Sequence, residues 1–520
     1  MKLQVGLIAD TLPWQQMLLQ EGVPFVHADL TSGAPPDLYS VLVINRMLSA
    51  NERSVIEEYL RRGGAVLGDA RHMERVARIT SRSEKLDFLV SDGDLLIPDV
   101  HMLDLGVVGA VPVEANQLRT QSNTHGMFAG PCGGGFAVVL PFDVPAAMCD
   151  TRTATKNFYS DRDRLPAEAV SLVSKGELRH LLHRSLEYLH HARSLPYAHL
   201  WYFPRGNRNL FVFRIDTDAA PERDVEELYT IAREHDVSIS WFVDVGSAES
   251  WLRRYALMVG QELGVHCYEH QTYPTFEANL KNIDKAKRAI EALGVCPVGF
   301  AAPYGAWNPE LAKAIDHLAF EYSSEFSFAY DTFPLYPGNE STRFQTLQVP
   351  IHPICIGSLK RAGFMDKHMT EYYRATIERK LLRNEPLFFY HHPSHRSWDV
   401  MEYIFSSVEE KGIDNITMCE YARWWKERQR HKLSVSLEGD VLFARSDEQG
   451  APRDNVWLRL SRIGDEEIIA PLSDRIDMKS AGWSVGAKPL SPPADIRRIR
   501  EFDPRAMLGD LYGKMMRKLK

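Results

Sequence analysis

The stretch NLFVFRIDTD, residues 209–218, is an apolar run of strand length that ends in two acidic residues. Successive side chains of a strand point to opposite faces, so Arg214, Asp216 and Asp218 are expected on one face. Charged groups on a buried face are costly unless they are paired or bind a metal. Two interpretations fit: a functional site at the end of the strand, or an Arg214–Asp216 ion pair followed by Asp218 as a helix cap.

Strand-like and helix-like segments alternate regularly from this stretch onward. The helical patterns cover residues 222–236, 247–262, 280–294 and 308–319, and the strand-like runs cover 237–245, 263–270, 297–305 and 385–393. Repeated βα units of this length are typical of a parallel sheet whose chemistry lies at the carboxyl ends of its strands. We therefore expect an α/β fold with a TIM-like (β/α) barrel over residues 205–428.

A second, flavodoxin-like α/β unit is predicted before the barrel, over residues 1–200. Its strand-like runs 39–46 and 65–70 enclose a helical pattern, residues 49–64, that opens on a serine cap and closes on two glycines. The run GGGFAVVLPFDV, residues 133–144, is a further strand that would complete this sheet.

The pattern changes again after about residue 430. Residues 432–447 and 455–472 alternate between apolar and polar side chains with turn residues between them, which predicts a small antiparallel β domain over residues 430–520. The last stretch, residues 503–520, is predicted as an amphipathic helix with a basic end. Such a helix fits a solvated surface, and a weak contact with a membrane surface or a partner stays open.

The composition narrows the class of protein. The 520 residues carry a formal net charge of −8, which argues against a general nucleic-acid binder. The first residues lack the pattern of a signal peptide, and no apolar run is long enough to span a membrane. Six scattered cysteines without a C-x-x-C pair fit free thiols in a reducing compartment, so a cytoplasmic location is expected. The sequence gives no indication of the oligomeric state.

A candidate metal site combines the end of the first strand with a histidine pair. The segment ELGVHCYEH places His266 and His270 four residues apart. Nineteen histidines in the chain would produce roughly 0.7 such pairs by chance, so the pair needs a third ligand to be convincing. Asp218 offers that ligand. Two imidazoles and one carboxylate leave a divalent cation, most often Zn²⁺, with an open coordination position.

Four segments carry a resemblance to a known family. RIDTDAAP, ELGVHCYEHQTY, GFAAPYGAWNPEL and LFFYHHP follow one another as in the NodB-type polysaccharide deacetylases, carbohydrate esterase family four. The resemblance covers roughly residues 205–425. It implies Asp216 as the catalytic base, and Asp218, His266 and His270 as the metal ligands. The N-terminal region, for its part, resembles the class I glutamine-amidotransferase-like domains.

The same resemblance implies two further roles. Tyr304 would provide a main-chain donor for the negative charge that develops on the substrate oxygen. A histidine near the end of the late strand would protonate the leaving amine; His392 is our choice, with His391 as the close alternative.

One position departs from the family pattern. The third motif usually begins with an arginine that pairs with the base, and the equivalent residue here is Ala301. We hypothesise that Arg214 takes over this role for Asp216, because both lie on one strand face. The carboxylate that usually supports the acid histidine is also unclear from the sequence, and Glu325 and Asp331 both qualify.

The segment AGPCGGG contains a second candidate site, the G-x-C-x-G elbow of glutamine amidotransferases. Such an elbow needs a strand before the cysteine and a helix after it. Around Cys132 the order is inverted, so a glycine-rich turn is the preferred interpretation.

The sequence therefore predicts a metal-dependent hydrolase that removes an N-acyl group, in the first instance acetyl, from an amino sugar in a glycan or glycan precursor. An amidohydrolase acting on a non-carbohydrate C–N bond is one alternative. The other is a catalytically impaired glycan-binding or scaffold protein in polysaccharide assembly, an alternative that Ala301 favours.

Overall fold

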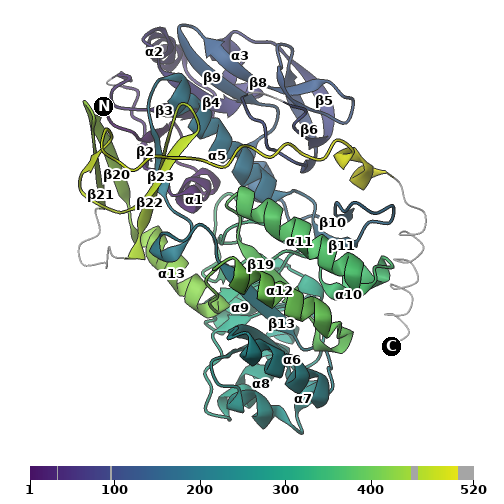
Figure 1. Cartoon of the computed structure of the whole chain (residues 1–520). Coiled ribbons are helices and arrows are strands. Elements are labelled where there is room, and N and C mark those ends of the chain that lie inside the picture. Colours follow the sequence, from purple (N-terminus) through teal and green to yellow (C-terminus); the bar gives the residue numbers. More distant parts are fainter. Residues whose placement is uncertain (32, 94–95, 447–454, 502–520) are drawn as a thin grey trace.

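The computed structural model describes residues 1–501 except 32, 94–95 and 447–454, and its centre is a parallel sheet of seven strands (Figure 1). The order β18-β17-β16-β15-β14-β13-β19 places the first strand beside the last. The strands are β13 (Phe211–Asp216), β14 (Ile239–Asp244), β15 (Glu262–Cys267), β16 (Gly299–Phe300), β17 (Tyr322–Ser323), β18 (Leu347–Gln348) and β19 (Leu387–His391). The predicted α/β barrel is thus a parallel half-barrel, with β18 and β19 as its edge strands.

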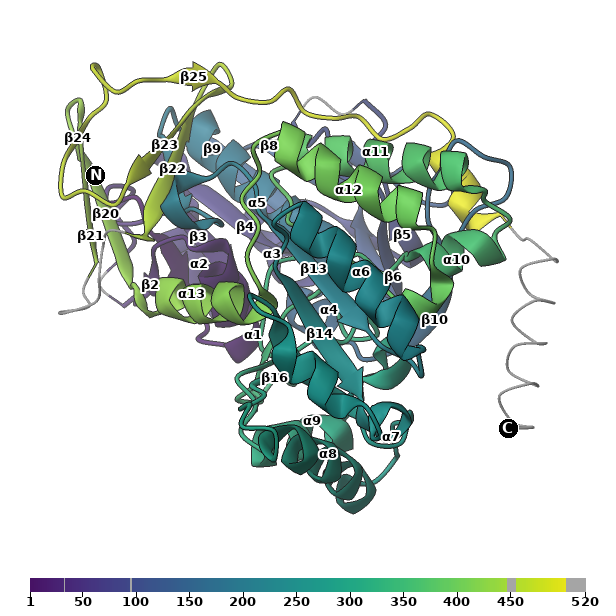
Figure 2. The same ribbon diagram turned by 60° about the horizontal axis from the view of Figure 1, so that its bottom comes forward.

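Helices cover one face of this sheet, as Figure 2 shows. Phe211, Phe213 and Ile215 of β13 pack on that side in one apolar cluster with residues of α6 (Glu222–Glu234) and α12 (Trp398–Glu410). Each such side chain contributes roughly 1.5–3 kcal/mol when it is fully buried. The alternate residues of β13, which include the charged ones, therefore point to the inner face of the half-barrel.

The other helices of this region connect successive strands or follow the last one. They are α7 (Val245–Ala248), α8 (Phe276–Glu291), α9 (Pro309–His317), α10 (Ile356–Arg361), α11 (Asp366–Leu382) and α13 (Met418–Arg430).

The N-terminal region contains a mixed sheet in the order β2-β1-β3-β4-β9-β8-β7. These strands are β1 (Val5–Leu7), β2 (Phe25–His27), β3 (Val41–Ile44), β4 (Ala65–Asp69), β7 (Gln117–Arg119), β8 (His125–Cys132) and β9 (Gly135–Leu140). Its helices are α1 (Leu12–Glu21), α2 (Ala50–Arg61), α3 (Ala70–Ala77), α4 (Val144–Met148) and α5 (Lys175–Ala192). The run at residues 133–144 does complete the sheet, because β9 pairs in parallel with β4. The hairpins β5 (Ser81–Leu89) with β6 (Leu103–Pro112) and β10 (Thr153–Asn157) with β11 (Ala167–Ser171) lie outside it.

The C-terminal region is antiparallel, as its alternating pattern predicted. One sheet joins β20 (Leu433–Glu438), β21 (Val441–Ser446) and β24 (Ile476–Asp477). The other joins β22 (Trp457–Arg462), β23 (Glu466–Pro471) and β25 (Ser484–Val485) to β12 (Tyr197–Leu200). Because β12 pairs antiparallel with β22, a strand that precedes the half-barrel is built into the C-terminal sheet. The helix predicted over residues 503–520 lies outside the described residues.

Buried charged groups join the three regions. The Arg428 guanidinium of α13 donates to the carbonyl oxygens of Trp201 (2.7 Å) and Leu200 (2.8 Å), and to that of Glu21 at the end of α1 (3.2 Å). Arg459 of β22 contacts Glu187 of α5 at 3.0 Å. Among the described residues, no helix combines the length and the apolar character that crossing a bilayer requires.

Candidate active site

Arg214 and Asp216 form a bidentate ion pair on the inner face of β13. Arg214 Nε and Nη2 lie 2.6 Å from the two carboxylate oxygens of Asp216, and Nη1 donates to the Ser324 carbonyl at 2.7 Å. The Arg214 side chain is fully buried and its guanidinium lies 5.5 Å from the ring centroids of Phe242 and Tyr390. Burial opposes the charge of Arg214, but Asp216 outweighs it and raises the pKa of the guanidinium. The predicted contact is present; its role in catalysis stays a prediction.

Asp218 is placed by a turn rather than by the alternation of the strand. β13 ends at Asp216, and the Ala220 N–H donates to the Thr217 carbonyl at 2.7 Å. Asp218 itself has a positive φ of 35°. The prediction that Asp218 continues the strand face was wrong, because the chain leaves the sheet two residues earlier.

Three side chains meet at this turn. Asp218 Oδ1 lies 3.0 Å from His266 Nε2 and 2.9 Å from His270 Nε2, and the two imidazole nitrogens lie 3.1 Å apart. His266 comes from the end of β15, where its Nδ1 contacts the Ala301 carbonyl at 2.7 Å. With that nitrogen as the donor, Nε2 presents its lone pair toward the group.

The donor set and its spacing fit a divalent cation. Ligands about 2.0–2.1 Å from a tetrahedral Zn²⁺ lie about 3.3–3.4 Å apart, so the three atoms need to separate by only a few tenths of an ångström. Burial raises the pKa of Asp218, but the charges and hydrogen bonds of His392, His266 and His270 outweigh it and hold that pKa well below its usual range. The carboxylate is therefore available as a ligand at neutral pH.

Tyr304 lies beside the same group. It sits in a single 3₁₀ turn (Pro303–Gly305) with a φ of 60°, and its ring meets that of His270 edge-on with centroids 5.0 Å apart. The tyrosine side chain is about half exposed. The residue thus combines a left-handed backbone with a position next to the metal-ligand candidate His270.

The structure separates the two neighbouring histidines at the end of β19. His392 Nε2 lies 3.3 Å from Asp218 Oδ2, so this imidazole belongs to the site. Burial lowers its pKa, but Asp218 and Cys355 outweigh that effect and raise the pKa to about 9. His391 points to the helix side, where its ring meets that of Trp398, and burial lowers its pKa well below the usual value. Of the two, His392 is the one that contacts the group of Asp218, His266 and His270.

Neither carboxylate proposed to support the acid histidine does so. Glu325 is fully buried, accepts a hydrogen bond from Ser323 Oγ at 2.8 Å, and has its pKa raised to about 7 by burial. Asp331 pairs instead with Lys380 at 2.7 Å and His352 at 3.0 Å. Among the contacts of the described residues, neither of the two candidates that the sequence left open reaches His392, and Asp331 has a left-handed backbone with a φ of 46°.

Cys132 lies in a glycine-rich turn, as preferred. It is the last residue of β8 and pairs with Gly135, the first residue of β9, across an antiparallel hairpin. Burial raises the pKa of the Cys132 thiol. The strand and helix arrangement of a nucleophile elbow is not formed around it.

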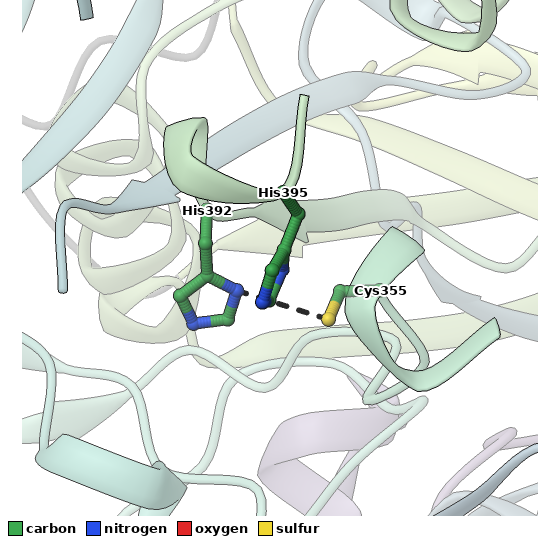
Figure 3. Close-up of side chains that lie close together, drawn as sticks. All are labelled: Cys355, His392 and His395. Carbon is green, nitrogen blue, oxygen red and sulfur yellow. Dashed lines mark hydrogen bonds between the residues drawn. The ribbon is translucent and has the colours of Figure 1, made fainter. Parts of the chain in front are cut away.

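Sequence reasoning missed two residues near His392. Cys355, the residue before α10, lies with its Sγ 3.8 Å from His392 Nδ1, and His395 stands beside them, as Figure 3 shows. Burial raises the pKa of Cys355, but His392 and His395 outweigh it and lower the pKa well below the usual value. The H-x-x-H spacing of the histidines was visible in the sequence, whereas nothing in it links them to Cys355.

The geometry agrees with the comparison against protein families. Residues 213–323 match the family model described as polysaccharide deacetylase. The matched residues run from β13 to β17 and are similar to a polysaccharide deacetylase domain. The matched range contains Asp216, Asp218, His266, His270 and Tyr304, and it ends before Cys355 and His392.

Several solved structures are similar to the chain. One, from Mycobacterium smegmatis, is described as a polysaccharide deacetylase; it is 18% identical, with 44% of this chain and 94% of that chain covered and a TM-score of 0.39. A family-four pseudoenzyme from Bacillus anthracis is 16% identical over 42% of this chain and 68% of its own, with a TM-score of 0.31. A peptidoglycan deacetylase from Bacillus subtilis is 16% identical over 43% and 95%, with a TM-score of 0.30. No curated protein matches the chain.

Proposed function

We propose that the protein is a metal-dependent hydrolase that removes an N-acyl group, specifically acetyl, from an amino sugar in a glycan or glycan precursor. The observation that carries the proposal is the cluster of Asp218, His266 and His270 next to the Arg214–Asp216 pair. The carboxylate oxygen and the two imidazole nitrogens of this cluster lie about as far apart as ligands of one cation do. Two imidazoles and a carboxylate are the donor set of a hydrolytic zinc site with an open position.

Each residue has a role in this proposal that its surroundings support. A divalent cation held by the three ligands would supply Lewis-acid polarisation of the acyl carbonyl. Asp216 accepts a proton from the attacking water, while Arg214 holds its carboxylate in place. The Tyr304 main-chain N–H donates to the oxygen that becomes negative. His392, whose pKa is raised to about 9, gives its proton to the leaving amine.

The missing arginine of the family pattern favours a second candidate, a glycan-binding protein without activity. Ala301 is fully buried and offers Asp216 no cation. Against this candidate, the Asp216 carboxylate has a bidentate partner in Arg214 from its own strand. A hydrolase acting on a non-carbohydrate amide would use the same residues, and only the substrate distinguishes it.

The decisive experiment measures acetate release from a panel of N-acetylated nucleotide sugars and oligosaccharides. Zn²⁺-supplied protein should release acetate from at least one member. Asp216→Asn should slow release by about 10²–10⁴-fold, the usual contribution of a general base. His266→Ala should in addition lose one equivalent of bound metal, and Cys132→Ser serves as the matched control that retains activity.

Two outcomes would contradict the proposal. Binding of a panel member without any acetate release would favour the inactive glycan-binding candidate. If the protein releases an amine only from a non-sugar amide, its substrate is not an amino sugar.

A cytoplasmic location is also part of the proposal. Its support is that all six cysteines are unpaired, which suits a reducing compartment.

A further inference from the structure

A second group of metal-ligating side chains lies next to the first. Cys355 immediately precedes α10, whereas His392 precedes, and His395 ends, the single 3₁₀ turn that follows β19 (Pro393–His395). Figure 3 shows the three side chains directed toward one another from these two elements. One sulfur and two imidazole nitrogens lie within 4.8 Å of one another.

The spacing of these atoms suits a zinc-like cation. A tetrahedral Zn²⁺ about 2.3 Å from sulfur and about 2.0–2.1 Å from nitrogen holds the two donors about 3.6 Å apart. Cys355 Sγ lies 3.8 Å from His392 Nδ1. A contact of this length is long for a strong hydrogen bond, and it is close to the separation that a shared cation would impose.

His395 provides an independent observation. Its Nδ1 is buried, yet it has no hydrogen-bond partner among the residues that the structure describes. An unsatisfied buried nitrogen costs roughly 1–3 kcal/mol, so its position needs an explanation. Gly357 leaves room for the His395 imidazole, because a Cβ at position 357 would lie 2.2 Å from His395 Cε1.

The surroundings complete a polar environment for a cation. Ser358 Oγ lies 3.6 Å from Cys355 Sγ and donates to Glu168 of β11 at 2.9 Å. Glu168 thus brings a carboxylate from the N-terminal region next to this group, where it also pairs with Arg361 at 2.9 Å. On its other side, the His392 ring reaches Asp218 of the first group through Nε2.

We propose that Cys355, His392 and His395 form a second metal site, which takes a thiophilic divalent cation of the zinc class. The site differs from the first group in its sulfur donor, which selects softer cations over Mg²⁺ or Ca²⁺. Binding takes Cys355 as the thiolate and both imidazoles as neutral ligands, so the proton that Cys355 and His392 share is released to solvent, and the acid role of His392 in the proposed function belongs to the protein without the second cation.

Cobalt titration of the full chain tests this site. The protein is stripped with a chelator, kept reduced with a phosphine, and titrated with Co²⁺. Two equivalents should bind, and one of them should produce the near-ultraviolet thiolate-to-cobalt charge-transfer absorption. Cys355→Ser should lose that absorption and one equivalent, whereas Cys296→Ser, which changes an exposed thiol, should keep both.

The two metal groups can be told apart in the same experiment. Asp218→Asn should lose the other equivalent and keep the charge-transfer absorption. Should only the absorbing equivalent bind to the wild type, the proposed function would fail while the second site stands. If Cys355→Ser does not fold by circular dichroism, His395→Ala replaces it and should likewise remove the absorption. A wild-type protein without the absorption, or variants that keep it, would overturn the second site.

Discussion

At the scale of single residues, the ion pair with Arg214 fixes the orientation of the carboxylate of Asp216, the proposed base. Asp216 is almost fully buried and receives both of its close charge-assisted bonds from this one guanidinium. Removing one partner of a buried pair leaves an uncompensated charge, at a cost of about 3–5 kcal/mol. The arginine thus serves both the stability of the strand end and the orientation of the carboxylate.

We expect Arg214→Ala to lower kcat/KM for acetate release and to lower the free energy of unfolding by about 3–5 kcal/mol. In the double variant with Asp216→Asn, most of the lost stability should return because no buried charge is left. Urea unfolding and initial rates measure the two effects. A kcat/KM for Arg214→Ala equal to that of the wild type would show that Arg214 does not replace the arginine missing at position 301.

The contribution of Glu325 to the free energy of unfolding depends on pH. Burial raises its pKa from 4.5 to about 7, so the folded state favours the protonated carboxyl. Its contribution is fully present below about pH 4.5 and is lost as pH rises through 7, a loss of roughly 3 kcal/mol. Glu325→Gln should therefore stabilise the protein at pH 8 and change little at pH 5, as measured by urea unfolding.

Glu321→Gln is the matched control for that experiment. The hydrogen bond from Arg423 lowers the pKa of Glu321, so this variant should lose stability at pH 8 and recover it in acid. If the difference between Glu325→Gln and wild type is the same at pH 5 and pH 8, the buried carboxyl does not titrate as stated.

At the scale of elements, the tight turn between β8 and β9 is fixed by backbone contact. A Cβ on Gly135 would lie 2.0 Å from the Gly64 carbonyl oxygen and 2.9 Å from that of Leu60. Only glycine lets the start of β9 approach the end of α2 this closely. The glycines around Cys132 thus serve packing.

We expect Gly135→Ala to destabilise the protein by about 1–3 kcal/mol, the usual cost of forced overpacking. Gly482→Ala is the control, because its Cβ would meet no atom within 4 Å. Unfolding midpoints in urea compare the two variants. Equal midpoints would mean that α2 moves aside without cost.

The strands and helices were predictable from the sequence to the extent that their patterns are local. The apolar residues of β13 and β15 indicate buried strands from the local sequence alone, so the half-barrel and the meeting of His266 with Asp218 could be predicted. Turn geometry could not: the positive φ of Asp218 and the orientation of Asp331 depend on backbone packing. Nor does any local pattern join Cys355 to His392, which lies 37 residues further along.

At the scale of the whole molecule, Arg428 of α13 links the half-barrel to main-chain carbonyls of residues 19–21 and 200–201, which all precede the half-barrel in the sequence. Burial lowers its pKa to about 10, which still leaves it charged at neutral pH. Every one of these carbonyls would lose a charged donor if the guanidinium were removed.

Arg428→Met should lower the free energy of unfolding by about 1–3 kcal/mol, the cost of leaving buried carbonyls without a donor, and speed limited proteolysis. Arg430→Met should change stability by less than about 1 kcal/mol, because Arg430 pairs with Glu427 at the surface. Tryptophan fluorescence and circular dichroism should follow one common transition in the wild type. Two separate transitions in the wild type would show that the regions unfold independently.

Because β12 pairs with β22, the sheet that contains both strands cannot form until the ribosome has synthesised β22. Tyr197 of β12 and its partner Ser461 of β22 are 264 residues apart in the chain. At a synthesis rate of roughly 5–20 residues per second, the early strand waits roughly 13–53 s before its partner emerges. During that interval the edge of β12 is exposed to other chains, and a chaperone that shields it would determine the yield of native protein.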